Sequence, residues 1–305
     1  AQALSGLAPV MLEMGRLDEA ESLCRRAVEA DAKYAAGWSH LGITLMRKGD
    51  VKSARECTEK AIECAPEDAA LWVNLAFVAR AQGDRQTASE KLREASRLKP
   101  LDAQIRNNYG TILYELGDMA GAIAQLREAV RIDPNHAMAI GNLGLALLDR
   151  GQLAEAESVL RDALDKDAAN EAARSGYGRL LRAKHNYEEA LKQFEALLAR
   201  DPGNVEALVE TAWTYATADE PVYRNDPRGQ AAAERACQMV EFRNPACLDA
   251  LAACQAANGN FSEAIRTAEE AVRLARASGQ DVHAAQIEQR LTGYRAGQPC
   301  RTPPR

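Results

Sequence analysis

The most reactive side chains in this 305-residue sequence are seven cysteines, and all of them lie near the two ends of the chain: Cys24, Cys57, Cys64, Cys237, Cys247, Cys254 and Cys300. Cys57 and Cys64 are seven residues apart, and the same spacing separates Cys247 from Cys254. On one helix this places the two Cα atoms about 10 Å apart, beyond the reach of a disulfide. The candidate disulfides therefore join Cys24 to either Cys57 or Cys64, and Cys237 to either Cys247 or Cys254.

Two interpretations of the cysteines stay open. Six of them could form disulfides that stabilise the ends of the chain, where a repeat has only one neighbour and gains most from a cross-link. The odd seventh, Cys300, is then a candidate intermolecular thiol. This interpretation favours an exported protein, periplasmic or extracellular. Alternatively, the cysteines are small buried hydrophobic residues of a reduced, cytoplasmic protein.

The remaining residues with catalytic potential show no catalytic arrangement. The four histidines, His40, His136, His185 and His283, are far apart in the sequence, and there is no glycine-rich phosphate loop, zinc-protease motif or nucleophile elbow. No cysteine spacing resembles a structural zinc motif. We therefore expect a protein that is not an enzyme and that needs no cofactor or metal.

Composition narrows the class of partner. The formal net charge is −6, without a block of lysine and arginine, which argues against nucleic acid as a partner. No apolar run approaches the roughly 20 residues that span a bilayer, so membrane insertion is not expected. Hydrophobic residues make up 47% of the chain but aromatic residues only 5%. An apolar surface made mainly of alanine and leucine favours closely packed helices over a β-sandwich.

The elements that position these residues follow a period of 34. A glycine followed five residues later by an alanine recurs from Gly15 and Ala20 to Gly151 and Ala156, and again at Gly259 and Ala264. Such a glycine can adopt the left-handed conformation that ends a helix, and the small alanine lets two helices approach. A regular period of this length indicates a repeat array.

The repeated pattern resembles the tetratricopeptide repeat. One unit carries Trp38, Leu41, Gly42 and Leu45, followed by Ala54, Thr58, Ala61 and Pro66; the next carries Trp72, Leu75 and Ala76, followed by Ala88, Leu92, Ala95 and Pro100. The resemblance covers residues 1 to about 278 and implies an all-α, right-handed α-solenoid of about eight helix-turn-helix repeats. The segment from Asn244 to Gly297 is similar to the closing end of many bacterial repeat proteins.

The register of the repeats gives a single solenoid over residues 1–297. Its repeats are expected near 1–34, 35–68, 69–102, 103–136, 137–170, 171–204, 205–244 and 245–278, followed by a capping helix at 281–296 and a flexible tail at 298–305. Two departures from the pattern stand out. His185 replaces the turn glycine, where we expect Asn186 to adopt the left-handed conformation, and the seventh repeat contains an extra loop at Asp219–Arg228. In the capping helix we expect Ile287, Leu291 and Tyr294 to face inward and Arg290 to face solvent.

The resemblance also implies a binding groove, because the first helix of each repeat lines the concave face in this family. Two positions that step by 34, together with one neighbouring residue, give the candidate groove residues His40, Ile43, Asn74, Phe77, Asn107, Asn108, Asn142, Leu145, Arg179 and Trp213. Asn74, Asn108 and Asn142 resemble the asparagine ladder with which some members grip an extended peptide, since an amide both donates and accepts. The alternative is that these asparagines satisfy neighbouring helix ends.

Trp213 carries its own pair of hypotheses. On the groove it would be an exposed anchor for a partner, whereas the long loop of the seventh repeat could instead fold over it and bury it. Trp38 and Trp72, in contrast, occupy the structural tryptophan position of the family. The basic residues with which chaperone-binding members hold a terminal carboxylate are missing from the matching positions.

The sequence thus predicts a non-enzymatic scaffold for protein–protein interaction that binds an extended polypeptide in its concave groove. The alternative is an exported structural subunit that stacks end to end with copies of itself into a filament or larger assembly.

Overall fold

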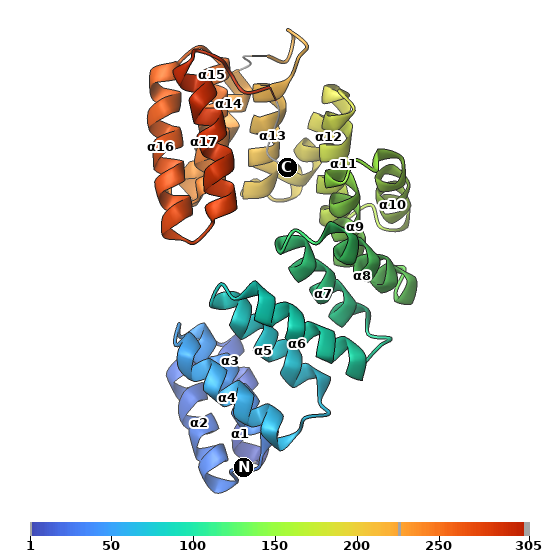
Figure 1. The fold of residues 1–305 in the computed structure, drawn as a ribbon, viewed down its shortest axis with the longest axis vertical. Coiled ribbons are helices and arrows are strands. Elements are labelled where there is room, and N and C mark those ends of the chain that lie inside the picture. The colour runs from blue at the N-terminus through green and yellow to red at the C-terminus, as the bar shows by residue number, and fades with distance from the viewer. Residues whose placement is uncertain (1, 225–226, 302–305) are drawn as a thin grey trace. The chain divides into compact units, whose positions relative to one another are not determined.

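The computed structural model describes residues 2–224 and 227–301, and within them all regular structure is helical (Figure 1). The helices are α1 (Gln2–Glu13), α2 (Leu17–Ala30), α3 (Ala35–Arg47), α4 (Val51–Cys64), α5 (Ala69–Ala81), α6 (Arg85–Leu98), α7 (Ala103–Glu115), α8 (Met119–Ile132), α9 (Ala137–Asp149), α10 (Leu153–Lys166), α11 (Glu171–Ala183), α12 (Tyr187–Arg200), α13 (Val205–Thr217), α14 (Pro227–Met239), α15 (Pro245–Ala257), α16 (Phe261–Ala277) and α17 (Asp281–Arg295).

The turn between the two helices of a repeat has a recurring construction, which the turn between α7 and α8 illustrates. Gly117 has a φ of +81°, a conformation that side chains with a Cβ rarely adopt. The next residue, Asp118, begins α8 and accepts a hydrogen bond from the backbone N–H of Gly121 at 2.9 Å. A carboxylate at this position satisfies one of the free N–H groups of the first helical turn. The glycine thus ends one helix and the aspartate starts the next.

Close contact between the two helices of a repeat explains why a small residue follows Leu or Tyr in the first helix. A Cβ atom on Gly110 of α7 would lie 2.6 Å from Cγ of Leu126 on α8. The equivalent atom on Gly144 would lie 2.4 Å from Leu160. Because real Cβ atoms do not approach this closely, the leucine fills space that only glycine leaves open.

The family tryptophans connect a helix to the turn before it. The indole nitrogen of Trp38 donates to the carbonyl oxygen of Ala32 at 2.9 Å, and that of Trp72 donates to Pro66 at 2.8 Å. In later repeats the side chain of Arg174 makes the same connection to Ala168, six residues earlier. These contacts give Trp38 and Trp72 the structural role that the sequence predicts.

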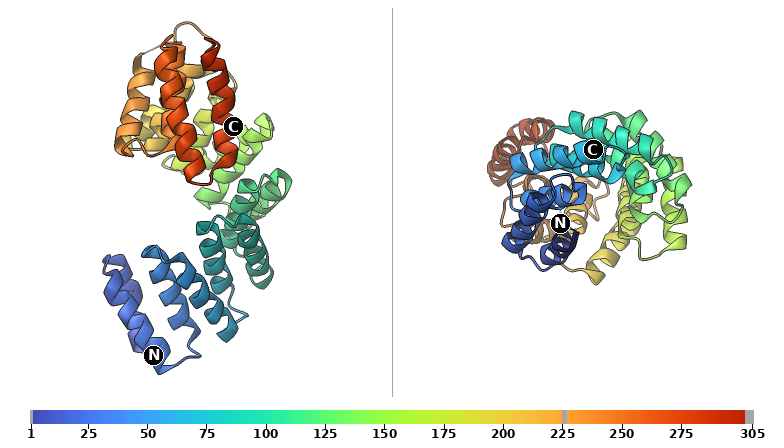
Figure 2. Two further views of the ribbon diagram at one scale, coloured as in Figure 1. Left: turned by 60° about the vertical axis from the view of Figure 1, so that its left-hand side comes forward. Right: turned by 90° about the horizontal axis from the view of Figure 1, so that it is seen from below.

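The helices form two compact units, and the boundary between them lies within α9, after Asn142. Inside each unit consecutive helices pack on one another, and the first helices of successive repeats also touch, as α1 with α3 and α13 with α15 (Figure 2). In the first unit, small clusters of apolar side chains fill the space between neighbouring helices. The single array predicted for residues 1–297 stays a prediction.

The largest core belongs to the second unit and is formed by residues of α13 to α17. Ile287, Leu291 and Tyr294 of α17 are buried in it, as predicted. The expectation that Arg290 faces solvent is wrong. Its guanidinium makes a two-pronged hydrogen bond with Asp249 of α15, a residue with 0% exposure, in which Nε lies 3.0 Å from Oδ1. Burying the carboxylate requires such a partner, so the charge of Asp249 draws Arg290 inward.

Two further expectations need correction. His185 itself, rather than Asn186, has the left-handed conformation, with φ +61°, because Asn186 is the residue that begins α12 and accepts from Glu189 N–H. Pro227 and Arg228, placed in the extra loop, are the first residues of α14. In the tail, Gln298 N–H donates to the carbonyl of Gly293, and Cys300 packs against the large core. Residues 302–305 of the predicted flexible tail lie outside the described residues.

Candidate peptide-binding surfaces

The asparagines predicted for the groove connect each repeat to the one before it. Nδ2 of Asn74 on α5 donates to Oγ of Ser39 on α3 at 3.0 Å. Nδ2 of Asn142 on α9 donates to Oδ1 of Asn107 on α7 at 2.9 Å, and lies 3.3 Å from Oγ1 of Thr111. Asn107 is buried, so it belongs to the packing between helices rather than to an open surface. Part of the amide capacity is therefore structural, although the partners are side chains within helices rather than the helix ends of the alternative interpretation.

Asn108 has different partners. Its Oδ1 accepts a hydrogen bond from Nε2 of Gln104 at 2.9 Å, and Oε1 of Gln104 faces Nε2 of His136 at 3.2 Å. Asn108 is half-buried and Gln104 is exposed. The three asparagines that step by 34 are thus not bonded to one another; each joins a separate local network.

These networks leave hydrogen-bonding capacity on the amides. Within the described part of the chain, the side-chain oxygens of Asn74 and Asn142 accept no hydrogen bond, and the side-chain NH₂ of Asn108 donates none. All three residues are half-buried, so solvent reaches them. The row can therefore still offer two acceptors and one donor to a ligand.

The apolar groove candidates divide between open and closed positions. Phe77 on α5 is 36% exposed, whereas His40 and Ile43 on α3 are half-buried. All three residues belong to the first unit. Leu145 is half-buried in the second unit, where it packs near Gly176.

Trp213 is not on an open surface. It is 2% exposed and lies in the large core of the second unit, with the guanidinium of Arg290 5.5 Å from its ring centre. The prediction of an exposed anchor is therefore wrong. The ring is covered because α15 packs directly on α13 and α17 adds Arg290 above it. The residues that bury it come from these helices, whereas the alternative expected the loop to do so.

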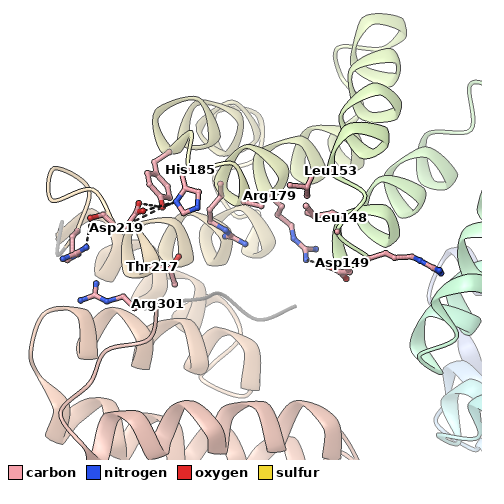
Figure 3. A pocket seen from close by; sticks show the side chains of 14 residues that line it. Leu148, Asp149, Leu153, Arg179, His185, Thr217, Asp219 and Arg301 are labelled. Carbon is pink, nitrogen blue, oxygen red and sulfur yellow. Dashed lines mark hydrogen bonds and ion pairs between the residues drawn. The ribbon is translucent and has the colours of Figure 1, made fainter.

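A cavity of about 890 Å³ opens in the second unit, at the carboxyl ends of α9, α11 and α13. Figure 3 shows Arg179 between Leu148 and Asp149 on one side and His185 and Asp219 on the other. The lining contains five arginines: Arg150, Arg179, Arg182, Arg224 and Arg301. It also contains two aspartates, Asp149 and Asp219, and side chains with apolar groups: Leu148, Leu153, Ala183 and Thr217.

Two of the arginines project from α11 and share one carboxylate. Arg182 is buried and its guanidinium lies 2.6 Å from Oε2 of Glu210 on α13. Arg179, one turn earlier, lies 3.6 Å from both Glu210 and Asp149. Burial lowers the pKa of Arg182, which the attraction of Glu210 partly counteracts. Because arginine stays charged in proteins, these groups place fixed positive charge at the back of the cavity.

His185 is held in its left-handed turn by a side-chain network at the rim. Its Nδ1 lies 2.9 Å from the hydroxyl of Tyr187 and 3.1 Å from Oδ2 of Asp219, and the Tyr187 hydroxyl donates to Oδ1 of Asp219 at 2.6 Å. The bonds from Tyr187 and His185 lower the pKa of Asp219. Burial, followed by the Asp219 contact, raises the pKa of Tyr187 to about 12. The network fixes the start of the linker between α13 and α14 against α12.

The cysteines lie inside the two units as thiols. Cys24 and Cys57 share one core cluster, whereas Cys64 sits apart, with its Sγ 3.7 Å from the carbonyl oxygen of Ala32. At the other end a second core contains three more, Cys237, Cys247 and Cys254. The structure therefore brings Cys24 near Cys57 rather than Cys64, and the proposed disulfides stay a prediction.

Sequence reasoning missed the arginine cavity. Arg179 was a groove candidate, but Arg182, Arg224 and Arg301 were not, because they come from a helix, a linker and a tail that no repeat pattern relates. The departures at His185 and at the long seventh repeat were the available signals, since both border the cavity. In the described residues, no group of three or more His, Cys, Asp and Glu side chains is arranged to hold a metal ion. None of the described helices is both long and apolar enough to span a membrane.

Comparisons with known proteins agree with this architecture. Family models described as tetratricopeptide repeat match residues 11–76, 73–137 and 147–210. A comparison with curated proteins found no similar sequence.

Among solved structures, PilF of Pseudomonas aeruginosa is 20% identical with a TM-score of 0.58, over 68% of this chain and 94% of that one. A tetratricopeptide repeat protein from Parabacteroides merdae is 19% identical with a TM-score of 0.62, over 83% and 98%. Yeast Tom70 is 17% identical with a TM-score of 0.64, over 92% of this chain and 59% of its own. At these identities the likeness concerns the fold. Together with the family matches and the helix-turn-helix geometry, it shows that the chain is an all-α protein of the tetratricopeptide repeat family.

Proposed function

We propose that this protein is a non-enzymatic scaffold that binds an extended segment of a partner polypeptide along the asparagine row of its first unit. Tetratricopeptide repeats are protein-interaction modules whose stacked first helices provide extended binding surfaces. The observation that supports the asparagine row is the remaining hydrogen-bonding capacity of Asn74, Asn108 and Asn142. Two acceptors and one donor, spaced by one repeat, match the alternating N–H and C=O groups of an extended backbone.

The test is a selection of peptides from a random display library on the purified chain, followed by fluorescence anisotropy with the selected peptides. Replacing Asn74, Asn108 and Asn142 together by alanine should weaken binding by about tenfold or more, the loss of two net hydrogen bonds of roughly 1 kcal/mol each. Circular dichroism should show unchanged helicity. Asn135→Ala, at an exposed loop position, is the control and should bind normally. Equal affinity of the triple variant would contradict the role of the row.

A second candidate function, end-to-end assembly, is favoured by the outer surface of α1. Leu7 and Val10 on α1 are 51% and 48% exposed, and Met14, directly after this helix, is 60% exposed. We propose that assembly uses this surface against another copy of the chain. Light scattering should then show multimers that Leu7→Ser with Met14→Ser reduces to the monomer. A wild-type monomer at all concentrations, with and without reductant, would contradict assembly.

An exported location is proposed on the proximity of the cysteines. Cys24 with Cys57, and Cys237 with Cys247 or Cys254, lie in shared clusters from which disulfides could form. Non-reducing peptide mapping of protein taken from its native cells tests this proposal. Recovery of all six cysteines in reduced form would instead favour the cytoplasmic alternative.

A further inference from the structure

The arginine cavity of the second unit has no part in the asparagine row, yet it has the size and lining of a binding site. Its volume of about 890 Å³ lies within the range of roughly 300–1,000 Å³ that is common for ligand pockets. We propose that this cavity binds an acidic segment of the partner polypeptide, in which carboxylate side chains flank an apolar one. The inference rests on the proposed function and adds a second, chemically distinct contact to it.

Positive charge at the mouth of the cavity supports an acidic ligand. Arg224, in the linker after α13, donates to the main-chain carbonyl oxygens of Ala218 and Asp219, at 3.2 and 2.6 Å. Carbonyl oxygens carry no net charge, so these bonds hold the guanidinium in place without neutralising it. Among the described residues, no carboxylate lies within ion-pair distance of Arg224 or of Arg301 in the tail. The side chain of Asp219, whose main-chain oxygen accepts from Arg224, is already bonded to Tyr187 and His185.

The back of the cavity adds two guanidinium groups that are fixed in position by the carboxylates of Glu210 and Asp149. Arg179 and Arg182 are held against α13 by Glu210, and the ion pairs of Arg179 are long, at 3.6 Å to each of two carboxylates. A ligand carboxylate entering the cavity would therefore meet guanidinium groups from α11, the linker and the tail together. Arginine is well suited to this role because its planar group binds a carboxylate through two parallel hydrogen bonds.

Apolar side chains distinguish the cavity from a site for a free inorganic anion. Leu148 and Leu153 lie on the side opposite Asp219 (Figure 3), and Ala183 and Thr217 also contribute to the lining. A segment that presents only negative charge would leave these groups in water. A leucine or similar side chain next to an acidic one would instead bury apolar area against them, which stabilises the complex.

A polypeptide fits the surroundings better than a nucleic acid. The whole chain carries a net charge of −6, so a long polyanion that reached beyond the cavity would meet repulsion. The aromatic side chains of the described lining, Tyr187 and His185, are both held by Asp219 rather than standing open for a base to stack on. A short acidic segment confines its charge to the cavity.

The experiment measures the affinity of the full chain for a rhodamine-labelled peptide, Gly-Ser-Glu-Leu-Glu-Glu-Leu-Gly-Ser, and for its counterpart with glutamine in place of each glutamate. Both ends of each peptide are blocked, so only side chains carry charge. We expect the acidic peptide to bind at least about tenfold more tightly than the amide peptide at low salt, and to weaken as salt is added. Equal affinity for the two peptides would overturn the proposal.

Charge reversal locates the contact. Arg301→Glu should weaken binding of the acidic peptide by about tenfold or more, and since the Arg301 side chain makes no ion pair with the described residues, the change should leave the fold intact. Arg301→Lys keeps the charge but lacks the planar group, so its affinity should lie between those of the wild type and of Arg301→Glu. Arg235→Glu, at an exposed position on α14 of the same unit, is the matched control and should bind as the wild type does. Equal weakening by Arg301→Glu and Arg235→Glu would indicate general charge attraction and overturn the proposal.

Two further outcomes separate this proposal from the proposed function. If acidic and amide peptides bind equally and both weaken when the three asparagines are replaced, the asparagine row is supported and the acidic cavity is not. A single-stranded oligonucleotide of equal charge serves as competitor. Displacement of the acidic peptide by this oligonucleotide, at lower concentration than by unlabelled peptide, would replace the acidic segment with nucleic acid.

Discussion

The buried pair of Asp249 and Arg290 is the clearest case in which one residue determines the position of another. Asp249 has 0% exposure, so its charge is stable only beside the guanidinium of Arg290. Arg290 in turn lies above the ring of Trp213, a cation–π arrangement. The pair thus links α13, α15 and α17 through two charges and one ring.

Removing one member of this pair should be costly. We expect Asp249→Ala to lower the free energy of unfolding by about 3 kcal/mol or more, because it leaves the guanidinium of Arg290, whose side chain is 11% exposed, without its carboxylate. Chemical denaturation followed by circular dichroism measures the loss. Arg276→Ala removes the exposed pair of Arg276 with Glu288 and should cost below about 1 kcal/mol. Similar losses for the two variants would show that the Asp249 pair is not desolvated in solution.

The cysteine thiols lead to a pH prediction. Burial raises the pKa of Cys24 and of Cys247 to about 11, and that of Cys237 to about 12, above the ordinary value of 9.0. Between pH 9 and 11 the unfolded chain therefore loses thiol protons that the folded chain keeps, and the free energy of unfolding falls as pH rises through this range. Below pH 9 the thiols contribute no pH dependence.

Denaturation in the presence of reductant at pH 8, 9, 10 and 11 tests this expectation. The variant Cys24→Ala with Cys237→Ala and Cys247→Ala is the control, and its stability should fall less steeply across the same range. Parallel curves for the two proteins would assign the alkaline loss to other groups. Fully disulfide-bonded protein offers no thiol to titrate and should resemble the control.

The sequence predicts residue roles well where neighbours are local. Trp38 and Trp72 contact a carbonyl six residues earlier, so the repeat pattern alone contains their environment. Trp213 occupies a different position in its repeat, and its cover comes from α15 and α17, which follow it by about 40 and 80 residues. Arg290 was misplaced for the same reason, since helical periodicity cannot reveal a carboxylate buried on another helix. The repeat pattern thus contains no information about charges that are buried against distant helices.

At the scale of the element, the turn glycines set where each helix stops. Gly117, with φ +81°, has open space around its Cα, so only backbone strain opposes a side chain there. Valine at this position should therefore destabilise the protein by about 1 kcal/mol or more. Thermal or chemical denaturation detects the loss. Ala120→Val, at an exposed position in the first turn of α8, adds the same side chain without a left-handed backbone and should cost a few tenths of a kcal/mol.

His185 shows what the repeat pattern can and cannot predict at such a turn. The absence of glycine correctly marked the turn between α11 and α12 as unusual, but not which residue would adopt the left-handed conformation. The answer depends on Asn186 beginning α12, and on Asp219 and Tyr187 holding the imidazole. Asp219 belongs to the linker of the next repeat, so the local sequence does not contain it.

At the scale of the whole molecule, the two units differ in how much they bury. The large core of α13 to α17 contains the most extensive cluster of buried side chains, whereas α1 has one neighbouring repeat and several exposed apolar residues. Because stability in repeat proteins accumulates from contacts with neighbours, opening should begin at α1 and α2. We expect native-state hydrogen exchange, read by mass spectrometry, to be fastest there and slowest in α13 and α15. Uniform protection along the chain would mean that it opens as one cooperative body.

Asp249 also has a bearing on engineering by recombination of repeats. A helix grafted after α16 must supply a cation at the position of Arg290. Otherwise the buried carboxylate of Asp249 has no charged partner. Consensus repeats are chosen for apolar contacts between neighbouring repeats and provide no such cation. A chimera that joins foreign repeats at this point should therefore carry Asp249→Ala or contain an arginine at the position of Arg290. This one ion pair thus determines which repeats can follow α16.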